Sequence, residues 1–297
     1  MNCYNGKKYL KKALDSIYNQ TFKDWEIVFV DNCSTDNSAQ IAKSYGDKVK
    51  YHKMEENIPL GAARKFGINF CSSNYIAILD TDDIWEPIAL EKLFEAITSG
   101  NFALAYGNRK LIDTMDKPIG EIHNVYAGEK GNFLPKLLMQ FDIPIVATII
   151  NKDKLYKSNL NFDDKVFGSE EYCLFLQLAV QNNFIAIEDF IVNYRVHESL
   201  STKLDDKIYK EREYTLNKII EDNVGIQEKY KKEFMEAFAR GAYYKAQYFI
   251  KQNKKIDAFK SLYQYKFTDY RYFILMVLTI MPQAFWDYLQ KKKYQRV

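Results

Sequence analysis

The sequence predicts an α/β fold, in which a mostly parallel β-sheet flanked by helices is followed by a helical C-terminal region. Short apolar strands alternate with helices of about a dozen residues over the first two thirds of the chain. The strand pattern disappears near residue 205, and helical periodicity then runs to the end. We therefore expect a domain over 1–205 and a helical region over 206–297.

The first elements are predicted from hydrophobic spacing. Tyr9, Leu10, Ala13 and Leu14 recur at helical intervals and predict a helix over 7–19. The sequence EIVFV predicts a buried strand, and the polar turn NCSTD that follows can cap the next helix. The same two periodicities predict strands over 49–53, 75–79, 102–106 and 184–188, and helices over 61–71, 87–99 and 170–182.

Charge and cysteine content limit the partners and the compartment. Lys and Arg number 42 against 39 Asp and Glu, and the resulting formal charge of +3 is too small to indicate a nucleic acid partner. The four cysteines show no C-x-x-C spacing of the kind that binds metals. Reduced thiols of this type indicate a cytoplasmic protein.

The C-terminal region contains an apolar run over 272–286, which Pro282 interrupts and which is shorter than the roughly 20 residues needed to span a bilayer. Arg271 precedes it, and a basic end with three consecutive lysines follows. One interpretation is a core helix with a solvated tail. The other is an interfacial anchor that gives the protein a peripheral contact with the inner face of the cell membrane.

Acidic residues stand where two predicted strands end. Asp31 follows one strand, and Asp80, Asp82 and Asp83 follow another within the sequence LDTDDIW. Ligands bind beyond the carboxyl ends of strands in open parallel sheets. Carboxylates this close repel one another unless a cation neutralises them, and oxygen ligands suit Mg²⁺ or Mn²⁺. The alternative is an acidic turn that only caps the helix predicted over 87–99.

The sequence resembles the family 2 glycosyltransferases of the GT-A fold, a large inverting family that builds bacterial surface polysaccharides. Six segments carry the resemblance in the family's order over about residues 1–200. They are the Tyr4-Asn5-Gly6 turn, SIYNQTFKDWEIVFVDNCSTDNS, NIPLGAARKFGI, YIAILDTDD, SEEYCLFLQL and YRVHESLST.

The resemblance implies which residues bind the nucleotide-sugar donor. Tyr4 matches the aromatic residue that packs on the base, and Asp31 matches a nucleoside-binding acid. Arg64 matches a basic position near the donor. Asn32 stands where the family usually has an aspartate that recognises the base, which implies an altered base preference because an amide both donates and accepts.

The resemblance also implies a metal site and a catalytic base. Asp80 and Asp82 match the D-x-D region that holds the ribose and the metal-bound diphosphate. The implied ligands of Mn²⁺ or Mg²⁺ are Asp82, Asp83 and His197, the last in the sequence YRVH. Glu170 and Glu171 match the family's Glu-Asp pair, whose second acid is the catalytic base.

The implied activity is transfer of a sugar, with inversion, from a nucleotide sugar such as a UDP-sugar to a hydroxyl of a glycan or lipid-linked acceptor, in cell-envelope polysaccharide or lipopolysaccharide synthesis. Two alternatives remain open. A nucleotidyltransferase would need a glycine-rich basic loop after the first strand, for which Tyr4-Asn5-Gly6 is a poor match. A non-catalytic nucleotide-sugar-binding relative would lack metal-dependent donor hydrolysis.

The family normally has an interior apolar strand before the Tyr-Asn turn, whereas here Met1 stands only three residues before Tyr4. An interior strand supplies hydrogen bonds to both neighbours. We therefore expect the physiological protein to start several residues upstream, with a Val/Ile-rich segment that runs into Met1.

Overall fold

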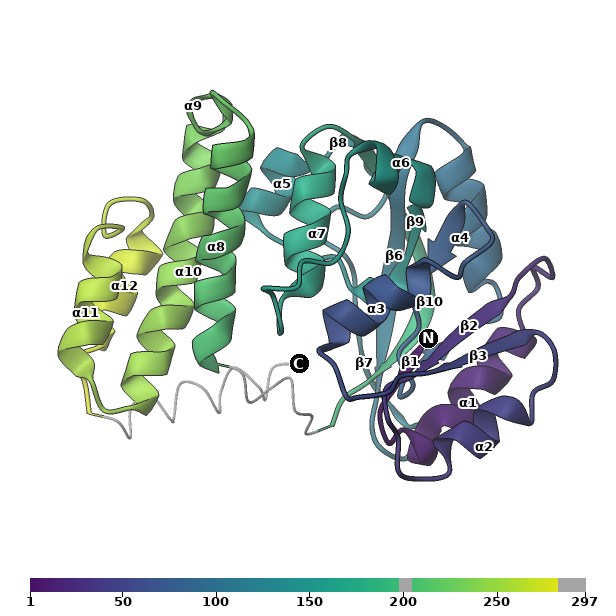
Figure 1. Ribbon diagram of the computed structural model, residues 1–297. Coiled ribbons are helices and arrows are strands. Elements are labelled where there is room, and N and C mark those ends of the chain that lie inside the picture. The colour runs from purple at the N-terminus through teal and green to yellow at the C-terminus, as the bar shows by residue number, and fades with distance from the viewer. Residues whose placement is uncertain (198–204, 283–297) are drawn as a thin grey trace. The chain divides into compact units, whose positions relative to one another are not determined.

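The computed structural model describes residues 1–197 and 205–282 (Figure 1). The chain forms two compact units. The first contains residues 1–134 and 142–197, and the second contains residues 135–141 together with the C-terminal region. The predicted α/β class with a helical C-terminal region is confirmed. The domain boundary at residue 205 stays a prediction.

A three-stranded parallel sheet has the order β1-β2-β3, with bounds Asn2–Cys3, Ile27–Asp31 and Val49–Lys53. All five residues of β2 are buried because β2 is the central strand of this sheet and helices pack against it, as its apolar sequence predicts. Helices α1 (Lys7–Tyr18) and α2 (Ser38–Lys43) connect these strands.

The second sheet is mixed and has seven strands. Its path is β4-β9-β6-β10-β5, with β7 paired to β6 and β8 paired to β10. Only the β6–β10 pair in this sheet is parallel among the described pairs. In chain order the bounds of β4 to β10 are Tyr75–Ala77, Ile84–Trp85, Phe102–Ile112, Pro118–Ile122, Lys130–Asn132, Thr148–Asn151 and Asn183–Arg195.

Helices accompany the strands close to the predicted positions. The predicted helices over 61–71, 87–99 and 170–182 are found with slightly shorter bounds. The helices of this part of the chain are α3 Leu60–Ile68, α4 Ala89–Thr98, α5 Leu134–Met139, α6 Lys152–Lys157 and α7 Glu170–Ala179, with a 3₁₀ turn at Ile145–Ala147.

Two strands extend well beyond their apolar sequences. The predicted strands over 102–106 and 184–188 continue to Ile112 and Arg195. The extension of β6 contains polar residues. Among them, Asn108 can be fully buried because its amide donates to the carbonyl of Glu188. Backbone pairing with β7 and β10 therefore continues β6 where its apolar pattern stops.

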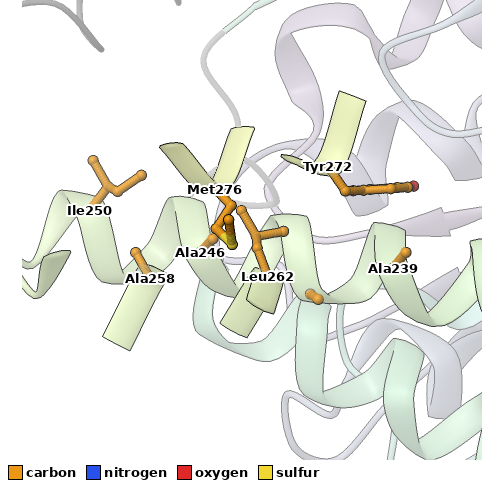
Figure 2. Close-up of a cluster of buried hydrophobic side chains, with 8 residues drawn as sticks. Ala239, Ala246, Ile250, Ala258, Leu262, Tyr272 and Met276 are labelled. Carbon is orange, nitrogen blue, oxygen red and sulfur yellow. The ribbon is translucent and has the colours of Figure 1, made fainter. Parts of the chain in front are cut away.

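The second unit consists of helices in its described C-terminal part. Small alanines on α10, including Ala239 and Ala246, face a core that also contains Leu262, Tyr272 and Met276 (Figure 2). Within the described residues, no helix is long and apolar enough to cross a membrane. The bounds of α8 to α12 are Asp205–Asp222, Ile226–Lys229, Lys231–Lys251, Lys255–Tyr263 and Tyr270–Leu278.

A cavity of about 410 Å³ in the first unit lies between β2 and β4, and apolar side chains such as Ile76 and Phe94 line it. Met1 contributes to its wall, and the Met1 ammonium donates to the carbonyl of Val28 at 2.9 Å. Burial lowers the pKa of this ammonium below its ordinary value of 8.0. The pairing of β1 with β2 thus ends on a buried charge beside an apolar cavity.

We expect an engineered extension of four Val or Ile residues ahead of Met1 to raise the melting temperature. The extension would continue β1 along β2, replace the buried ammonium by a peptide bond, and bury side chains worth roughly 1.5–3 kcal/mol each. Differential scanning calorimetry would compare it with a Gly/Ser extension of equal length.

The pH dependence gives a second readout of the same change. The folded ammonium has the lower pKa, so the unextended chain loses stability as pH falls below 8.0. The advantage of the Val/Ile extension over the unextended chain should therefore widen as pH falls, whereas its advantage over the Gly/Ser extension should not depend on this group. Equal melting temperatures for both extensions would show that the cavity does not accept a strand.

Candidate functional site

The loops that follow β1, β2 and β4 meet at one edge of the first unit. A Cβ atom at Gly6 would lie 2.8 Å from Oγ1 of Thr81, so only glycine allows the turn after β1 to approach the loop after β4 this closely. Thr81 belongs to the sequence DTDD, and residues 80–83 are called the acidic loop below. The predicted donor-binding turn and the predicted metal-binding loop are therefore neighbours.

Hydrogen bonds fix the turn after β1 to the loop after β2. Asn5 has a positive φ of 54° and its N–H donates to Ser34 Oγ at 3.0 Å. The Asn5 side-chain oxygen accepts from the N–H of Thr35 at 2.8 Å. Tyr4, which precedes this fixed residue, is 53% exposed and can offer its ring to a ligand.

Asp31, the last residue of β2, is 1% exposed and both of its carboxylate oxygens are engaged within the protein. One accepts from the N–H of Ser34 at 2.8 Å, and the other accepts from the hydroxyl of Tyr51. Burial and the Asp31 carboxylate raise the pKa of Tyr51, which keeps this phenol protonated as a donor. Asp31 therefore shapes the loop after β2.

Asn32 is also buried, and its amide is bound to the backbone of Ile58. The amide nitrogen donates to the Ile58 carbonyl at 2.7 Å, and the amide oxygen accepts from the Ile58 N–H at 2.9 Å. Asn57 additionally donates to the Asn32 carbonyl at 2.9 Å. In this structure the side chain anchors the segment before α3 and does not turn its paired oxygen toward a ligand, so base recognition by Asn32 stays a prediction.

Arg64 on α3 joins the acidic loop to the start of α7. It is 5% exposed, and its Nη2 donates to both oxygens of Asp80 at 3.0 and 3.2 Å. Burial acts to lower the pKa of Arg64, but Asp80, Glu171 and Glu170 outweigh it and raise this pKa. This arginine therefore neutralises carboxylates from two separate segments.

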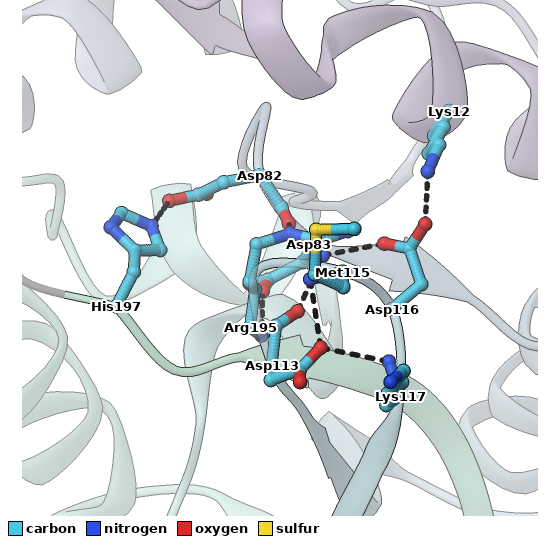
Figure 3. Close-up of polar contacts among 9 residues, drawn as sticks. All are labelled: Lys12, Asp82, Asp83, Asp113, Met115, Asp116, Lys117, Arg195 and His197. Atoms are coloured by element: carbon cyan, nitrogen blue, oxygen red, sulfur yellow. Dashed lines mark hydrogen bonds and ion pairs between the residues drawn. The ribbon is translucent and has the colours of Figure 1, made fainter.

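Arg195, the last residue of β10, holds the other two acids of the loop (Figure 3). Its N–H donates to Asp83 Oδ1 at 2.8 Å, and its Nε donates to the Asp82 carbonyl at 2.8 Å. Asp83 is 2% exposed, and burial with the nearby Asp82 and Asp80 charges raises its pKa well above the usual range. The Asp83 carboxyl is therefore buried inside the acidic loop, where it accepts the hydrogen bond from Arg195.

Asp82 has a different environment from Asp83. Its side chain is 35% exposed, and its Oδ2 lies 2.8 Å from Nε2 of His197. Asp82 and His197 therefore stand together at the surface of the loop (Figure 3). Among residues 1–197 and 205–282, no group of three His, Cys, Asp or Glu side chains is already gathered as a metal site.

A carboxylate and an imidazole nevertheless fit a divalent cation that takes most of its ligands from a substrate. Mg²⁺ in proteins is commonly held by one or two carboxylates together with phosphate oxygens and water. Asp82 and His197 supply such a partial set, whereas Asp83 is already bound to the Arg195 N–H. The geometry favours the first two as ligands, and the assignment of Asp83 stays a prediction.

The two glutamates at the start of α7 differ in exposure. Glu170 is 4% exposed, and a Cβ at Gly61 of α3 would lie 3.0 Å from its Cγ, so it packs against α3. Glu171 is partly exposed. Both stand in the first helical turn, where the backbone dipole favours negative charge.

The structure gathers most of the residues that the sequence singled out. Arg64, Asp80 and the α7 glutamates form one charged group, and Asp82 with His197 adjoins it through the acidic loop. Sequence reasoning missed Arg195, although it stands in the sequence YRVH two residues before His197. A positive residue at the end of an apolar strand was the available signal.

Comparison with known proteins identifies relatives of the chain. Residues 1–160 match the family described as Glycosyl transferase family 2. The chain is 33% identical to the glycosyltransferase MJ1057 of Methanocaldococcus jannaschii, over 66% of this chain and 69% of that protein. It is 27% identical to the UDP-Glc:alpha-D-GlcNAc-diphosphoundecaprenol beta-1,3-glucosyltransferase WfgD of Escherichia coli, over 67% and 76% of the two chains. It spans only 34% of a Rickettsia felis glycosyltransferase to which it is 26% identical.

Solved structures share the fold at low sequence identity. Staphylococcus aureus TarS 1-349 in complex with UDP-GlcNAc matches with a TM-score of 0.72 and 16% identity, over 94% of this chain and 85% of that one. The mannosyltransferase PcManGT from Pyrobaculum calidifontis, in complex with GDP-Man and Mn²⁺, matches with a TM-score of 0.63 and 12% identity, over 98% and 82%. The predicted GT-A fold is thereby confirmed.

Proposed function

This chain belongs to glycosyl transferase family 2, and from that premise we propose that it transfers a sugar from a UDP-sugar to a hydroxyl of a glycan or lipid-linked acceptor during cell-surface polysaccharide synthesis. The observation that carries the proposal is the Asp82–His197 pair, which remains at the surface of an acidic loop whose other acids are bound by arginines. The glucosyltransferase WfgD, named for UDP-Glc and a lipid-linked acceptor, and the UDP-GlcNAc complex of TarS support the donor and acceptor classes.

Donor binding would use the two adjoining loops. Tyr4 offers an exposed ring for stacking on the base, while Asp31 and Asn32 hold the loop and segment that surround it. Asp80, whose side chain is 31% exposed and is held by buried Arg64, would contact the ribose and diphosphate edge of the donor. Stacking and hydrogen bonds of this kind would fix the position of the anomeric carbon before transfer.

We propose Asp82 and His197 as the protein ligands of Mn²⁺ or Mg²⁺, and the Mn²⁺ complex of PcManGT supports a divalent ion in this fold. When bound, the ion would stabilise the negative charge of the leaving nucleoside diphosphate. Asp82 Oδ2 and His197 Nε2 are 2.8 Å apart, so the two side chains are close enough to be ligands of one ion.

Glu171 is the proposed general base. A sugar hydroxyl is a weak nucleophile, so a carboxylate must accept its proton as it attacks the anomeric carbon. Attack on the face opposite the diphosphate inverts the configuration. Partly exposed Glu171 can reach an acceptor, whereas buried Glu170 packs against α3.

We expect Glu171→Gln to lower kcat by about 10²-fold or more with little change in donor affinity, because the amide cannot accept the proton. The matched variant Glu170→Gln should lower kcat less.

The donor would first be chosen by thermal shift among UDP-Glc, UDP-GlcNAc and GDP-Man with Mn²⁺. Release of nucleoside diphosphate would then be measured. A larger loss in Glu170→Gln would move the base to Glu170, and no turnover in the unsubstituted protein with any donor would contradict the proposed function.

The helical unit supports the proposal of a peripheral contact with the inner face of the cell membrane. Along α12, Tyr270, Phe273, Ile274 and Val277 follow helical spacing and are 73%, 48%, 48% and 39% exposed, while Tyr272 and Met276 face the core. The basic end with Lys291–Lys293 lies outside the described residues. An exposed apolar stripe of this kind suits the boundary between lipid headgroups and acyl chains.

We expect the double substitution Phe273→Ser and Ile274→Ser to lower binding to vesicles that contain phosphatidylglycerol by at least tenfold, because each apolar side chain contributes roughly 1.5–3 kcal/mol on burial. Val224→Ser, at a fully exposed loop position, serves as the control. Co-sedimentation would measure the bound fraction. Equal binding by all three proteins would leave the stripe without a membrane role.

A further inference from the structure

We propose that Arg195 is a positioning residue that sets the acidic loop and His197 for metal-dependent binding of the donor diphosphate, an inference that rests on the proposed function. Nothing in the sequence resemblance assigned a role to this side chain. The evidence for this role is a set of contacts that the buried guanidinium of Arg195 makes (Figure 3).

The sheet register brings Arg195 to the acidic loop. Strand β10 pairs antiparallel with β5, with Val192 opposite Trp85 and Asn193 opposite Ile84. Continued by two residues, this register places Arg195 beside Asp82. The N–H and Nε of Arg195 then bind Asp83 Oδ1 and the Asp82 carbonyl, so that one residue holds two consecutive members of the loop.

The same guanidinium binds the turn between β6 and β7, which spans residues 113–117. Its Nη1 donates to the Asp113 carbonyl at 2.8 Å and forms an ion pair with Asp116. The Asp113 carboxylate accepts from the N–H groups of Met115 and Lys117 at 2.7 and 2.9 Å, which gives the turn a defined shape. The acidic loop is thereby fixed to a rigid turn outside it.

An aromatic ring connects Arg195 to His197. The guanidinium carbon lies 4.2 Å from the centroid of the Tyr9 ring, and the Tyr9 and His197 ring centroids are 6.0 Å apart. Tyr9 comes from α1, so Arg195 contacts three elements outside its own strand. The side chain is completely buried, which excludes a direct contact with substrate in this structure.

A lysine cannot replace these contacts. The planar guanidinium donates in several fixed directions and stacks on an aromatic face, whereas an ammonium is a compact point charge. Arg195→Lys keeps the positive charge that the acids require but loses the simultaneous hold on the Asp82 and Asp113 carbonyls. The expected defect is therefore in the geometry of the loop and of His197, with the charge balance retained.

The test is isothermal titration of UDP into the protein with and without Mn²⁺. The readout is the ratio of the two affinities, which needs no turnover. We expect Arg195→Lys to lower this ratio by about tenfold while metal-free UDP binding changes by less than threefold. Lys12→Met is the matched control, because Lys12 pairs with Asp116 but does not contact Arg195, and should keep the ratio of the unsubstituted protein.

Asp116→Asn is a second variant for the case that Arg195→Lys does not fold. Asp116 is partly exposed, and among the contacts of the Arg195 guanidinium the substitution removes only this ion pair. It should lower the ratio by about threefold. An unchanged ratio in both variants, or an equal fall in metal-free binding, would overturn the proposal. Absence of any Mn²⁺ effect in the unsubstituted protein would instead contradict the metal part of the proposed function.

Discussion

The site depends on two buried arginines that hold its acidic loop in place. Burial together with the Asp82 and Asp80 charges raises the pKa of Asp83, and Arg64 interacts both with Asp80 and with the glutamates at the start of α7. Arg64 and Arg195 are both almost inaccessible to solvent. Buried charges are costly unless they are paired and hydrogen-bonded. The fold meets this requirement because α3 supplies one arginine and the end of β10 supplies the other.

The acids of the loop differ in burial and in partner: Asp83 is buried, whereas the side chains of Asp80 and Asp82 are 31% and 35% exposed. Asp80 is bound by Arg64, and Asp83 is bound by the backbone of Arg195. Asp82 remains about one third exposed beside His197, and Glu171 remains partly exposed at the helix start. In the proposed function, Asp82 would bind a cation and Glu171 would accept a proton, which are two tasks of glycosyl transfer.

The sequence predicted elements whose side-chain pattern is periodic. It located the apolar strand that ends in Asp31, the acidic loop that follows another such strand, and the helix with Glu171. Burial on one face of a strand or helix leaves a regular pattern in the sequence. Strands β5, β7, β8 and β9 were missed, since they are short and depend on pairing with distant segments. The anchoring of Asn32 by Ile58 and the contacts of Arg195 arise from loops that meet only in the folded chain. Such contacts leave no local periodicity.

The central claim is that Asp82 is the acid left accessible for a metal-bound diphosphate. The most direct measurement is the Mn²⁺ dependence of UDP affinity, by isothermal titration, in the unsubstituted protein and in Asp82→Asn, with exposed Asp47→Asn as the control. The account predicts that Mn²⁺ strengthens UDP binding in the unsubstituted protein and in the control, and that Asp82→Asn loses this gain while its metal-free affinity is retained. An Asp82→Asn protein with the full Mn²⁺ effect would contradict the account.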